Sequence, residues 1–200
     1  MIELVQRNEA VRLLKSGRVV AVPTDTVYGV AAPLTHPKAV MDLFALKRRP
    51  SDAALPVLVD SLADIEGMGV TWPPLAARLS KAFWPGALTI VVAVDGALAE
   101  LVGSTEGTAG FRVPNHDLLR DVLIQCGPLA VTSANEHGEP PCNSADEVMS
   151  TFADHAGLGG VLDGDICAGA VSTVVEIYES GWRILRQGSL SADEITRILA

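Results

Sequence analysis

The sequence is poor in aromatic residues and contains no long apolar run. Aromatic residues account for 4% of the 200 positions although 48% are hydrophobic, so a core must be built mainly from Val, Leu, Ile and Ala. No run approaches the roughly 20 apolar residues that a membrane-spanning helix needs. Residues 1–7 also lack the basic-then-apolar layout of a signal peptide. We therefore expect one domain without a membrane segment, located in the cytoplasm.

Cysteine is scarce as well. The three cysteines are odd in number and scattered, which favours reduced thiols over a disulfide framework. The four histidines form no metal-binding pattern with one another or with cysteine. The acidic turn Asp163-Gly164-Asp165 is more typical of an ordinary loop than of a magnesium site. We predict no metal ion held by protein ligands alone.

Basic residues are outnumbered by acidic ones, 15 to 24, and the formal net charge is −9. Such a chain does not attract nucleic acid at long range, because that binding needs a basic surface. One local basic cluster, Lys47-Arg48-Arg49-Pro50, stands out. It follows a predicted helix, so its cations either complement the helix C-terminus or capture a phosphate or carboxylate. Composition alone leaves both interpretations open.

The order of apolar and capping residues predicts an α/β fold. Strands are expected at residues 19–22, 56–59, 88–94, 111–113, 129–132, 160–162, 173–177 and 182–185. Helices are expected to begin at Asn8, Pro37, Pro74 and Asn115, and at the S-x-x-E capping boxes of Ser144 and Ser191. The last three strands lie close in sequence, so some pairing should be antiparallel. The prediction is a single domain over residues 1–200 with a mixed sheet flanked by helices.

Two polar turns follow apolar strands in this pattern. Thr24-Asp25-Thr26 follows residues 19–22, and Ser133-Ala134-Asn135 follows residues 129–132. Each turn alone is more often an ordinary connection, because such side chains satisfy local backbone groups. Strand ends are also where open α/β sheets place ligands. Together with the basic cluster and two arginines near strands, they indicate a binding site.

Familiar catalytic motifs do not explain these turns. The sequence contains neither G-x-x-x-x-G-K-[ST] nor G-x-G-x-x-G after a strand. The glycine-rich residues 157–160 predict a flexible turn instead. Residue order alone supports no Ser/His/Asp arrangement.

Seven short motifs resemble, in the same order, those of the YrdC-like threonylcarbamoyl-AMP synthases. They cover about residues 8–188, and seven in order are far more specific than one. The chain is similar to the short, single-domain members of that family. The motifs are Pro23-Thr24-Asp25-Thr26-Val27-Tyr28-Gly29, Lys47-Arg48-Arg49-Pro50, Phe83-Trp84-Pro85-Gly86-Ala87-Leu88-Thr89, Arg112-Val113-Pro114, Ser133-Ala134-Asn135, Ser172-Thr173-Val174 and Leu185-Arg186-Gln187-Gly188.

The resemblance implies a nucleotidyltransferase reaction. L-threonine, bicarbonate and ATP would give threonylcarbamoyl-AMP and pyrophosphate. Downstream tRNA threonylcarbamoyl-transferase proteins would place the group on an adenosine beside the anticodon of certain tRNAs, and any direct binding of tRNA would be weak. Mg²⁺ would travel with ATP, and no protein ligands are assigned to it.

The resemblance also implies roles for individual residues. Threonine would be held by Thr26, Arg112 and Ser172. ATP would be held by Arg49, Thr108, Ser133, Asn135 and Arg186. Lys47 and Arg49 would be the catalytic cations, because attack of a carbamate on an α-phosphate brings two anions together. Positioning and charge neutralisation then matter more than a nucleophile, so Asp25 is not expected to act as a general base.

Some positions depart from the family's motifs. Ala53 and Leu58 stand where members often show Asn and His, Pro141 stands near a usual serine contact, and Glu139 replaces a basic residue. These changes support an alternative, a paralogue of the same fold that acts on another carbamoyl-type substrate. A third hypothesis is an RNA-binding module that uses the basic pocket, which the net charge of −9 disfavours.

Overall fold

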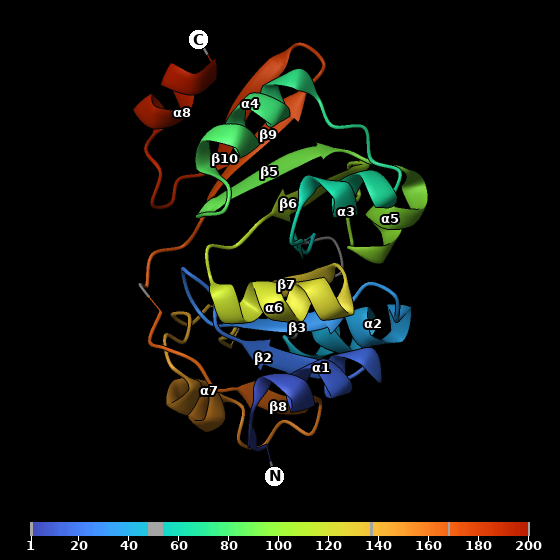
Figure 1. The fold of residues 1–200 in the computed structure, drawn as a ribbon, viewed down its shortest axis with the longest axis vertical. Helices are drawn as coiled ribbons and strands as arrows, with labels where there is room; N and C mark the ends of the chain where they lie inside the picture. Colours follow the sequence, from blue (N-terminus) through green and yellow to red (C-terminus); the bar gives the residue numbers. More distant parts are fainter. Residues whose placement is uncertain (1, 48–53, 137, 168, 200) are drawn as a thin grey trace.

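The computed structural model describes residues 2–47, 54–136, 138–167 and 169–199, and its strands form one ten-stranded sheet (Figure 1). The strands are β1 (Leu4–Val5), β2 (Val19–Val22), β3 (Gly29–Pro33), β4 (Val57–Leu58), β5 (Leu88–Ala93), β6 (Thr108–Arg112), β7 (Leu129–Ser133), β8 (Leu158–Leu162), β9 (Thr173–Tyr178) and β10 (Gly181–Arg186). The helices are α1 (Arg7–Lys15), α2 (Pro37–Leu46), α3 (Leu62–Gly67), α4 (Pro74–Phe83), α5 (Gly96–Leu101), α6 (Asp117–Cys126), α7 (Ala145–Thr151) and α8 (Ala192–Leu199). None of the helices in these described ranges is long and apolar enough to cross a membrane.

The sheet is mixed, in the order β1-β8-β2-β3-β7-β4-β6-β5-β9-β10. The parallel pairs are β1–β8, β2–β8, β4–β6 and β5–β9. The antiparallel pairs are β2–β3, β3–β7, β4–β7, β5–β6 and β9–β10. The prediction of an α/β fold with a mixed sheet is therefore confirmed.

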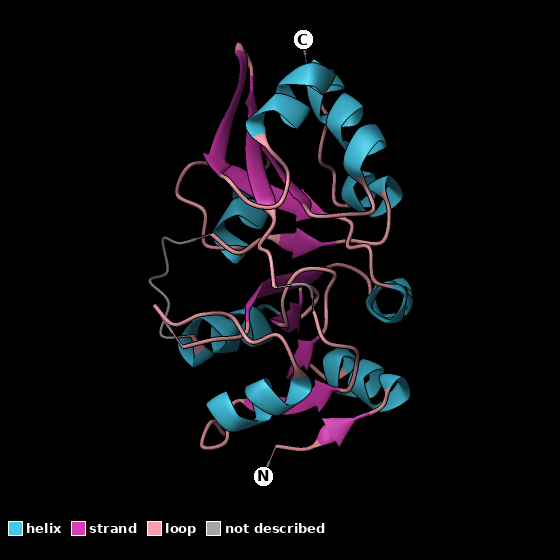
Figure 2. Ribbon diagram, turned by 90° about the vertical axis from the view of Figure 1, so that its left-hand side faces the viewer, coloured by secondary structure: helices cyan, strands magenta, loops and turns pink. Residues whose placement is uncertain are grey.

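Strand β2 shows why its sequence is a continuous apolar run. Val20 and Val22 pack with residues of α1 and α6, while Val19 and Ala21 pack in the cluster that contains α2. Successive strand residues point to opposite faces of a sheet, so helices on both faces require apolar side chains at every position. Figure 2 shows helices on both sides of the sheet in this part of the molecule.

The short strand β4 joins two parts of the sheet. Val57 pairs with Ala130 of β7 and with Phe111 of β6, and Leu58 continues both pairings. In the strand order β1, β8, β2, β3 and β7 lie on one side of β4, and β6, β5, β9 and β10 lie on the other. Figure 1 shows β8, β2, β3 and β7 in the lower part of the molecule and β6, β5, β9 and β10 in the upper part. We refer to these as the lower half and the upper half. Loops from both halves therefore meet beside β4.

The prediction of a flexible turn at residues 157–160 is wrong, because Leu158–Leu162 forms β8 between β1 and β2. A Cβ added at Gly159 would lie 3.0 Å from the Val19 carbonyl oxygen. One added at Gly160 would lie 3.0 Å from the side chain of Val5. The glycines thus permit the close approach of neighbouring strands and helices.

Two predicted helix starts are shifted by one or two residues. Helix α1 follows Gln6, whose carbonyl accepts from the N–H groups of residues 9 and 10, and not Asn8. Helix α6 follows His116, whose ring accepts from Leu119 N–H at 3.4 Å, and not Asn115. Ser144 and Ser191 each accept from the N–H three residues later, as predicted. The capping box is complete at Ser191, whose N–H donates to Glu194, whereas Glu147 accepts from the N–H of Asn143 instead of Ser144. The elements β1, β3, α3 and α5 were not predicted.

Candidate functional site

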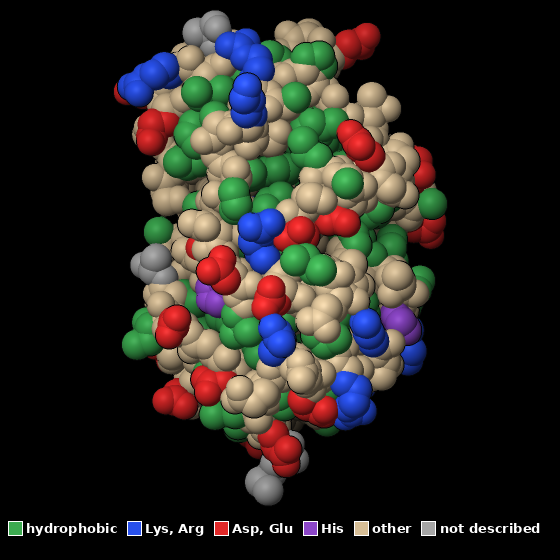
Figure 3. All heavy atoms as spheres, in the orientation of Figure 1, with side chains coloured by type: hydrophobic (Ala, Val, Ile, Leu, Met, Phe, Trp, Pro, Cys, Tyr) green, Lys and Arg blue, Asp and Glu red, His purple; other side chains and the backbone are tan. Residues whose placement is uncertain are grey.

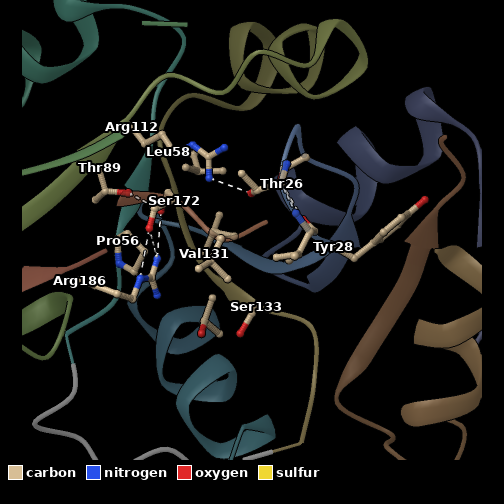
Figure 4. Close-up of a pocket in the computed structure, with 15 residues that line it drawn as sticks. Thr26, Tyr28, Pro56, Leu58, Thr89, Arg112, Val131, Ser133, Ser172 and Arg186 are labelled. Atoms are coloured by element: carbon tan, nitrogen blue, oxygen red, sulfur yellow. Dashed lines mark hydrogen bonds between the residues drawn. The ribbon is translucent and has the colours of Figure 1, made fainter. Parts of the chain in front are cut away.

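Two adjoining cavities lie beside β4. The first, of about 160 Å³, is lined from both halves (Figure 4). The second, of about 310 Å³, is lined by the upper half and by the segment that leads into β4. They share four residues: Pro56, Thr89, Ser172 and Arg186. Together they reach the roughly 300–1,000 Å³ of typical small-molecule sites.

One buried hydroxyl organises the loop after β2. Thr24 Oγ1 accepts from the backbone N–H groups of Thr26 at 3.0 Å and of Val27 at 3.2 Å. It also lies 2.7 Å from the Val27 carbonyl oxygen and 2.8 Å from Thr26 Oγ1. Threonine commonly stabilises turns through such local bonds. The loop therefore presents the Thr26 hydroxyl at the wall of the first cavity.

Arg112, at the end of β6, links the two halves. Its Nε donates to the Gly86 carbonyl at 2.9 Å, and its terminal nitrogens donate to Thr26 Oγ1 at 3.0 Å and to Asp25 Oδ1 at 2.7 Å. The side chain is 7% exposed. Burial lowers the pKa of the Arg112 guanidinium, and Asp25 acts in the opposite direction. Arginine stays charged even so, and the cavity wall carries a cation that is fixed in place.

A second cation, Arg186, is held in place by Ser172, the residue before β9. Arg186 donates to the Ser172 carbonyl from Nε at 3.2 Å and from a terminal nitrogen at 2.9 Å. The same terminal nitrogen donates to Ser172 Oγ at 3.0 Å. Thr89 Oγ1 lies 3.0 Å from Ser172 Oγ on the other side (Figure 4). The three side chains form one network at the boundary of the two cavities.

Gly188 has a backbone reason to be glycine. A Cβ added there would lie 2.3 Å from the Val171 carbonyl oxygen and 2.5 Å from the Thr173 nitrogen. Thr173 Oγ1 accepts from Gly188 N–H at 2.9 Å and from Leu190 N–H at 3.1 Å. The close approach of these backbones sets the place of Arg186 against Ser172.

Lys47 is bonded to the turn after β7. It caps α2, is 6% exposed, and its Nζ donates to the Asn135 carbonyl and, at 2.6 Å, to Asn135 Oδ1. Ser133 Oγ donates to the same Oδ1 at 2.6 Å. Asn135 Nδ2 in turn donates to the Glu136 and Glu139 carbonyls. Within the described ranges, Ser133 lines the first cavity, whereas Lys47 and Asn135 line neither cavity.

The structure brings most of the predicted residues together. The residues predicted for threonine all line the first cavity: Thr26, Arg112 and Ser172. Those predicted for ATP are divided, with Ser133 in the first cavity, Thr108 in the second and Arg186 in both. Arg49 and Ala53 lie outside the described residues.

Two cysteine thiols and one tyrosine hydroxyl near the site are held in their neutral forms. Burial raises the pKa of the Cys142 and Cys167 thiols, which disfavours the reactive thiolate. Burial also raises the pKa of Tyr28 to about 12, and its hydroxyl donates to the Gly164 carbonyl at 3.2 Å. No group of three or more His, Cys, Asp or Glu that could hold a metal ion occurs in the part of the chain that the structure describes.

Comparison with known proteins assigns the chain to a family. The family model described as "Telomere recombination", for Sua5, YciO and YrdC proteins, matches residues 12–188. The chain belongs to the Sua5/YciO/YrdC family.

Relatives in this family are similar over most of the chain. A Mycobacterium leprae protein, provisionally named threonylcarbamoyl-AMP synthase, is 40% identical over 191 residues, which cover 95% of this chain and 86% of the relative. The threonylcarbamoyl-AMP synthase of Photobacterium profundum is 32% identical over 184 residues, with 90% of this chain and 97% of that protein covered.

Solved structures of family members have the same fold. Pyrococcus abyssi Sua5 in complex with L-threonine superposes with a TM-score of 0.91 at 30% identity, and covers all of this chain. This chain spans 61% of that longer protein. Escherichia coli YciO superposes with a TM-score of 0.84 over 97% of this chain and 96% of its own; at 19% identity this likeness concerns the fold alone.

The departures from the family's motifs fall in different places. Leu58 is 3% exposed, pairs with Arg112 in register, and lines the first cavity. Glu139 is exposed and contacts Asn135 through its carbonyl group, so this contact does not depend on the side chain. Pro141 is half-buried and does not line either cavity described above. Leu58 therefore changes the cavity wall most directly.

Sequence reasoning gave no role to two polar residues of the first cavity. Thr89 and Thr132 are each 5% exposed and line the first cavity. Thr132 directly precedes the predicted polar turn, so the sequence would have indicated it if the turn had been taken to begin one residue earlier. Thr89 is the second residue of an apolar strand and the last residue of the motif 83–89, and its signal was a hydroxyl at a fully buried strand position.

Proposed function

We propose that this chain is an L-threonylcarbamoyladenylate synthase, a nucleotidyltransferase. The observation that carries the proposal is the convergence of Thr26, Arg112 and Ser172 on one cavity, next to a second cavity that Thr108 and Arg186 line. Adjoining cavities suit a reaction that joins two substrates. The similarity to Pyrococcus abyssi Sua5, whose structure contains L-threonine, supports threonine as the substrate of the first cavity.

In the proposed reaction, the amino group of threonine combines with bicarbonate and loses water to give a carbamate. A carbamate oxygen then attacks the α-phosphorus of ATP, and the bond from that phosphorus to pyrophosphate breaks. Because both reactants are anions, alignment and charge neutralisation supply most of the catalysis. Arg112 would bind the threonine carboxylate, and Arg186 would bind the phosphates. Lys47 and Arg49 remain the proposed catalytic cations.

The proposed synthase would need a metal ion for ATP and other proteins that use its product. Mg²⁺ would enter as its complex with ATP. We assign it to the phosphates of ATP and name no protein ligands for it. We place the protein in the cytoplasm, where downstream tRNA threonylcarbamoyl-transferase proteins would use the product.

One observation favours a second candidate function. Leu58 gives the first cavity an apolar wall at a position where similar synthases often have histidine. A paralogue that acts on another carbamoyl-type substrate would fit this change. Turnover of ATP without threonine, in a screen of amino acids and carbamoyl compounds, would support it.

An RNA-binding module is the less favoured alternative. Acidic and basic side chains are interspersed over the face shown in Figure 3. Binding of tRNA without nucleotide at physiological salt would support this alternative, since phosphate-driven binding weakens steeply with salt.

The direct test is to incubate the purified chain with ATP, L-threonine and bicarbonate. Mass spectrometry should detect threonylcarbamoyl-AMP, and pyrophosphate release should require all three substrates. Omitting each substrate in turn is the control. Pyrophosphate release that continues without threonine would contradict the proposal. We also expect Arg49→Ala to abolish the reaction; full activity in that variant would contradict the role proposed for Arg49.

The chain offers a matched pair of arginines on β10. Both side chains are exposed, but Arg186 lines both cavities, whereas Arg183, three residues earlier, lines neither and pairs with Glu176. We expect Arg186→Ala to lower kcat/KM for ATP roughly 10- to 100-fold, because a hydrogen bond to a charged group is worth about 1.5–3 kcal/mol. Arg183→Ala should stay within about twofold of the wild type. Equal losses in the two variants would show that Arg186 has no special role.

A further inference from the structure

Thr89 places a hydroxyl where the two cavities meet. It is the second residue of β5 and pairs with Val174 of the parallel strand β9. Its Cγ2 methyl packs towards Gly110, where an added Cβ would lie 3.0 Å away. Its Oγ1 lies 3.0 Å from Ser172 Oγ, its hydrogen-bond partner among the described side chains (Figure 4). Both hydroxyls line both cavities.

The protons of this pair can be counted. Two hydroxyl groups carry two protons, and one of them forms the bond between Thr89 and Ser172. Arg186 donates to Ser172 Oγ, so it occupies a lone pair and takes up no proton. The other hydroxyl proton has no acceptor within the described ranges. Whichever hydroxyl donates to the other, one donor remains for a group in the cavities.

The surroundings indicate the chemical class of that group. Arg186 holds a positive charge beside the spare donor, so an anionic oxygen would be stabilised there more than a neutral one. In the proposed reaction, the oxygens that meet at the boundary of the two cavities belong to the carbamate and to the α-phosphate. Both are anionic, and charge is redistributed between them as the new bond forms.

We propose that Thr89 is a positioning residue for this reaction, an inference that rests on the proposed synthase function. In this proposal the Thr89 hydroxyl donates to Ser172 Oγ, so that the proton of Ser172 is the one left for the anionic oxygen at the boundary. The motif resemblance assigns a role to Ser172 and none to Thr89. Thr89 acts on the substrates through Ser172.

Two substitutions separate the hydroxyl of Thr89 from its shape. Thr89→Val keeps the branched side chain and the packing on Gly110 but removes the hydroxyl, whereas Thr89→Ser keeps the hydroxyl. We expect Thr89→Val to lower kcat/KM for threonine roughly 10- to 100-fold, measured as pyrophosphate release with ATP and bicarbonate. Thr89→Ser should stay within about threefold of the wild type.

A double-mutant cycle tests whether Thr89 acts through Ser172. In a Ser172→Ala background, adding Thr89→Val should change kcat/KM by less than about threefold, because the group that Thr89 orients is already absent. An equal loss in both backgrounds would overturn the proposal. So would a Thr89→Val variant within threefold of the wild type.

The same experiment also checks that each variant folds and that the wild-type chain has the proposed synthase function. Melting temperatures are measured for every variant, and if Thr89→Val does not fold, Thr89→Ala takes its place against Thr89→Ser. A wild-type chain that makes no threonylcarbamoyl-AMP would overturn both the proposed function and this inference. An active wild type with an unaffected hydroxyl-free variant would overturn this inference alone.

Discussion

Replacing Thr24 by valine removes one buried hydroxyl and keeps the branched shape of the side chain. The backbone N–H groups of Thr26 and Val27 would then lose the acceptor that they share. A buried donor left unsatisfied costs about 1–3 kcal/mol, so we expect the free energy of unfolding to fall by about 3 kcal/mol. For a chain of 200 residues this corresponds to a melting temperature lower by about 6–12 °C.

The control for this prediction is Thr24→Ser, which keeps the hydroxyl and loses a methyl group worth about 1 kcal/mol. Urea unfolding followed by tryptophan fluorescence, together with thermal melting, compares the two variants with the wild type. The reasoning is refuted if Thr24→Val is as stable as Thr24→Ser. That result would mean that the loop after β2 is held by its other contacts.

Two further predictions concern glycine and tyrosine. Gly188→Ala should lower the free energy of unfolding by about 3 kcal/mol, since its Cβ would overlap the backbone of Val171 and its neighbours. Gly67→Ala, with no atom within 4 Å of the added Cβ, should be neutral or stabilising; equal melting temperatures for the two variants would contradict this. Tyr28 has its pKa raised by burial from 10 to about 12, so the stability that its neutral form contributes is complete below pH 10 and is lost as the pH rises towards 12. Tyr28→Phe should remove about 2–3 kcal/mol of this pH dependence in urea unfolding between pH 10 and 12; identical profiles would show that Tyr28 is not its source.

Elements with a strong local signature could be predicted from the sequence. Helices α2 and α4 begin where predicted, because each has proline in its first turn and an apolar face. Strand β3 could not be predicted in this way. Its residues Gly29-Val30-Ala31-Ala32-Pro33 favour strands weakly, and pairing with β2 and β7 on both sides overrides that preference.

The same contrast holds for the candidate site. The turns after β2 and β7 could be predicted, because polar residues directly follow apolar strands. Thr89 could not, because a threonine at the start of an apolar strand is typical of a strand former. Its partner Ser172 is 83 residues away in the sequence, and only the parallel pairing of β5 with β9 brings the two together. The contact between two site residues on distant paired strands therefore has no local signal in the sequence.

The position of β8 between β1 and β2 affects how the chain folds while it is being synthesised. The N-terminal strands meet their parallel partner only after residue 162 has left the ribosome. Closing so long a loop costs entropy before any contact is gained, which slows folding. Until then, the apolar strand β2 has an open edge of the kind that pairs with other chains. A nascent chain that ends before residue 158 therefore leaves this edge of β2 unpaired, whereas one that extends past residue 162 can pair it with β8.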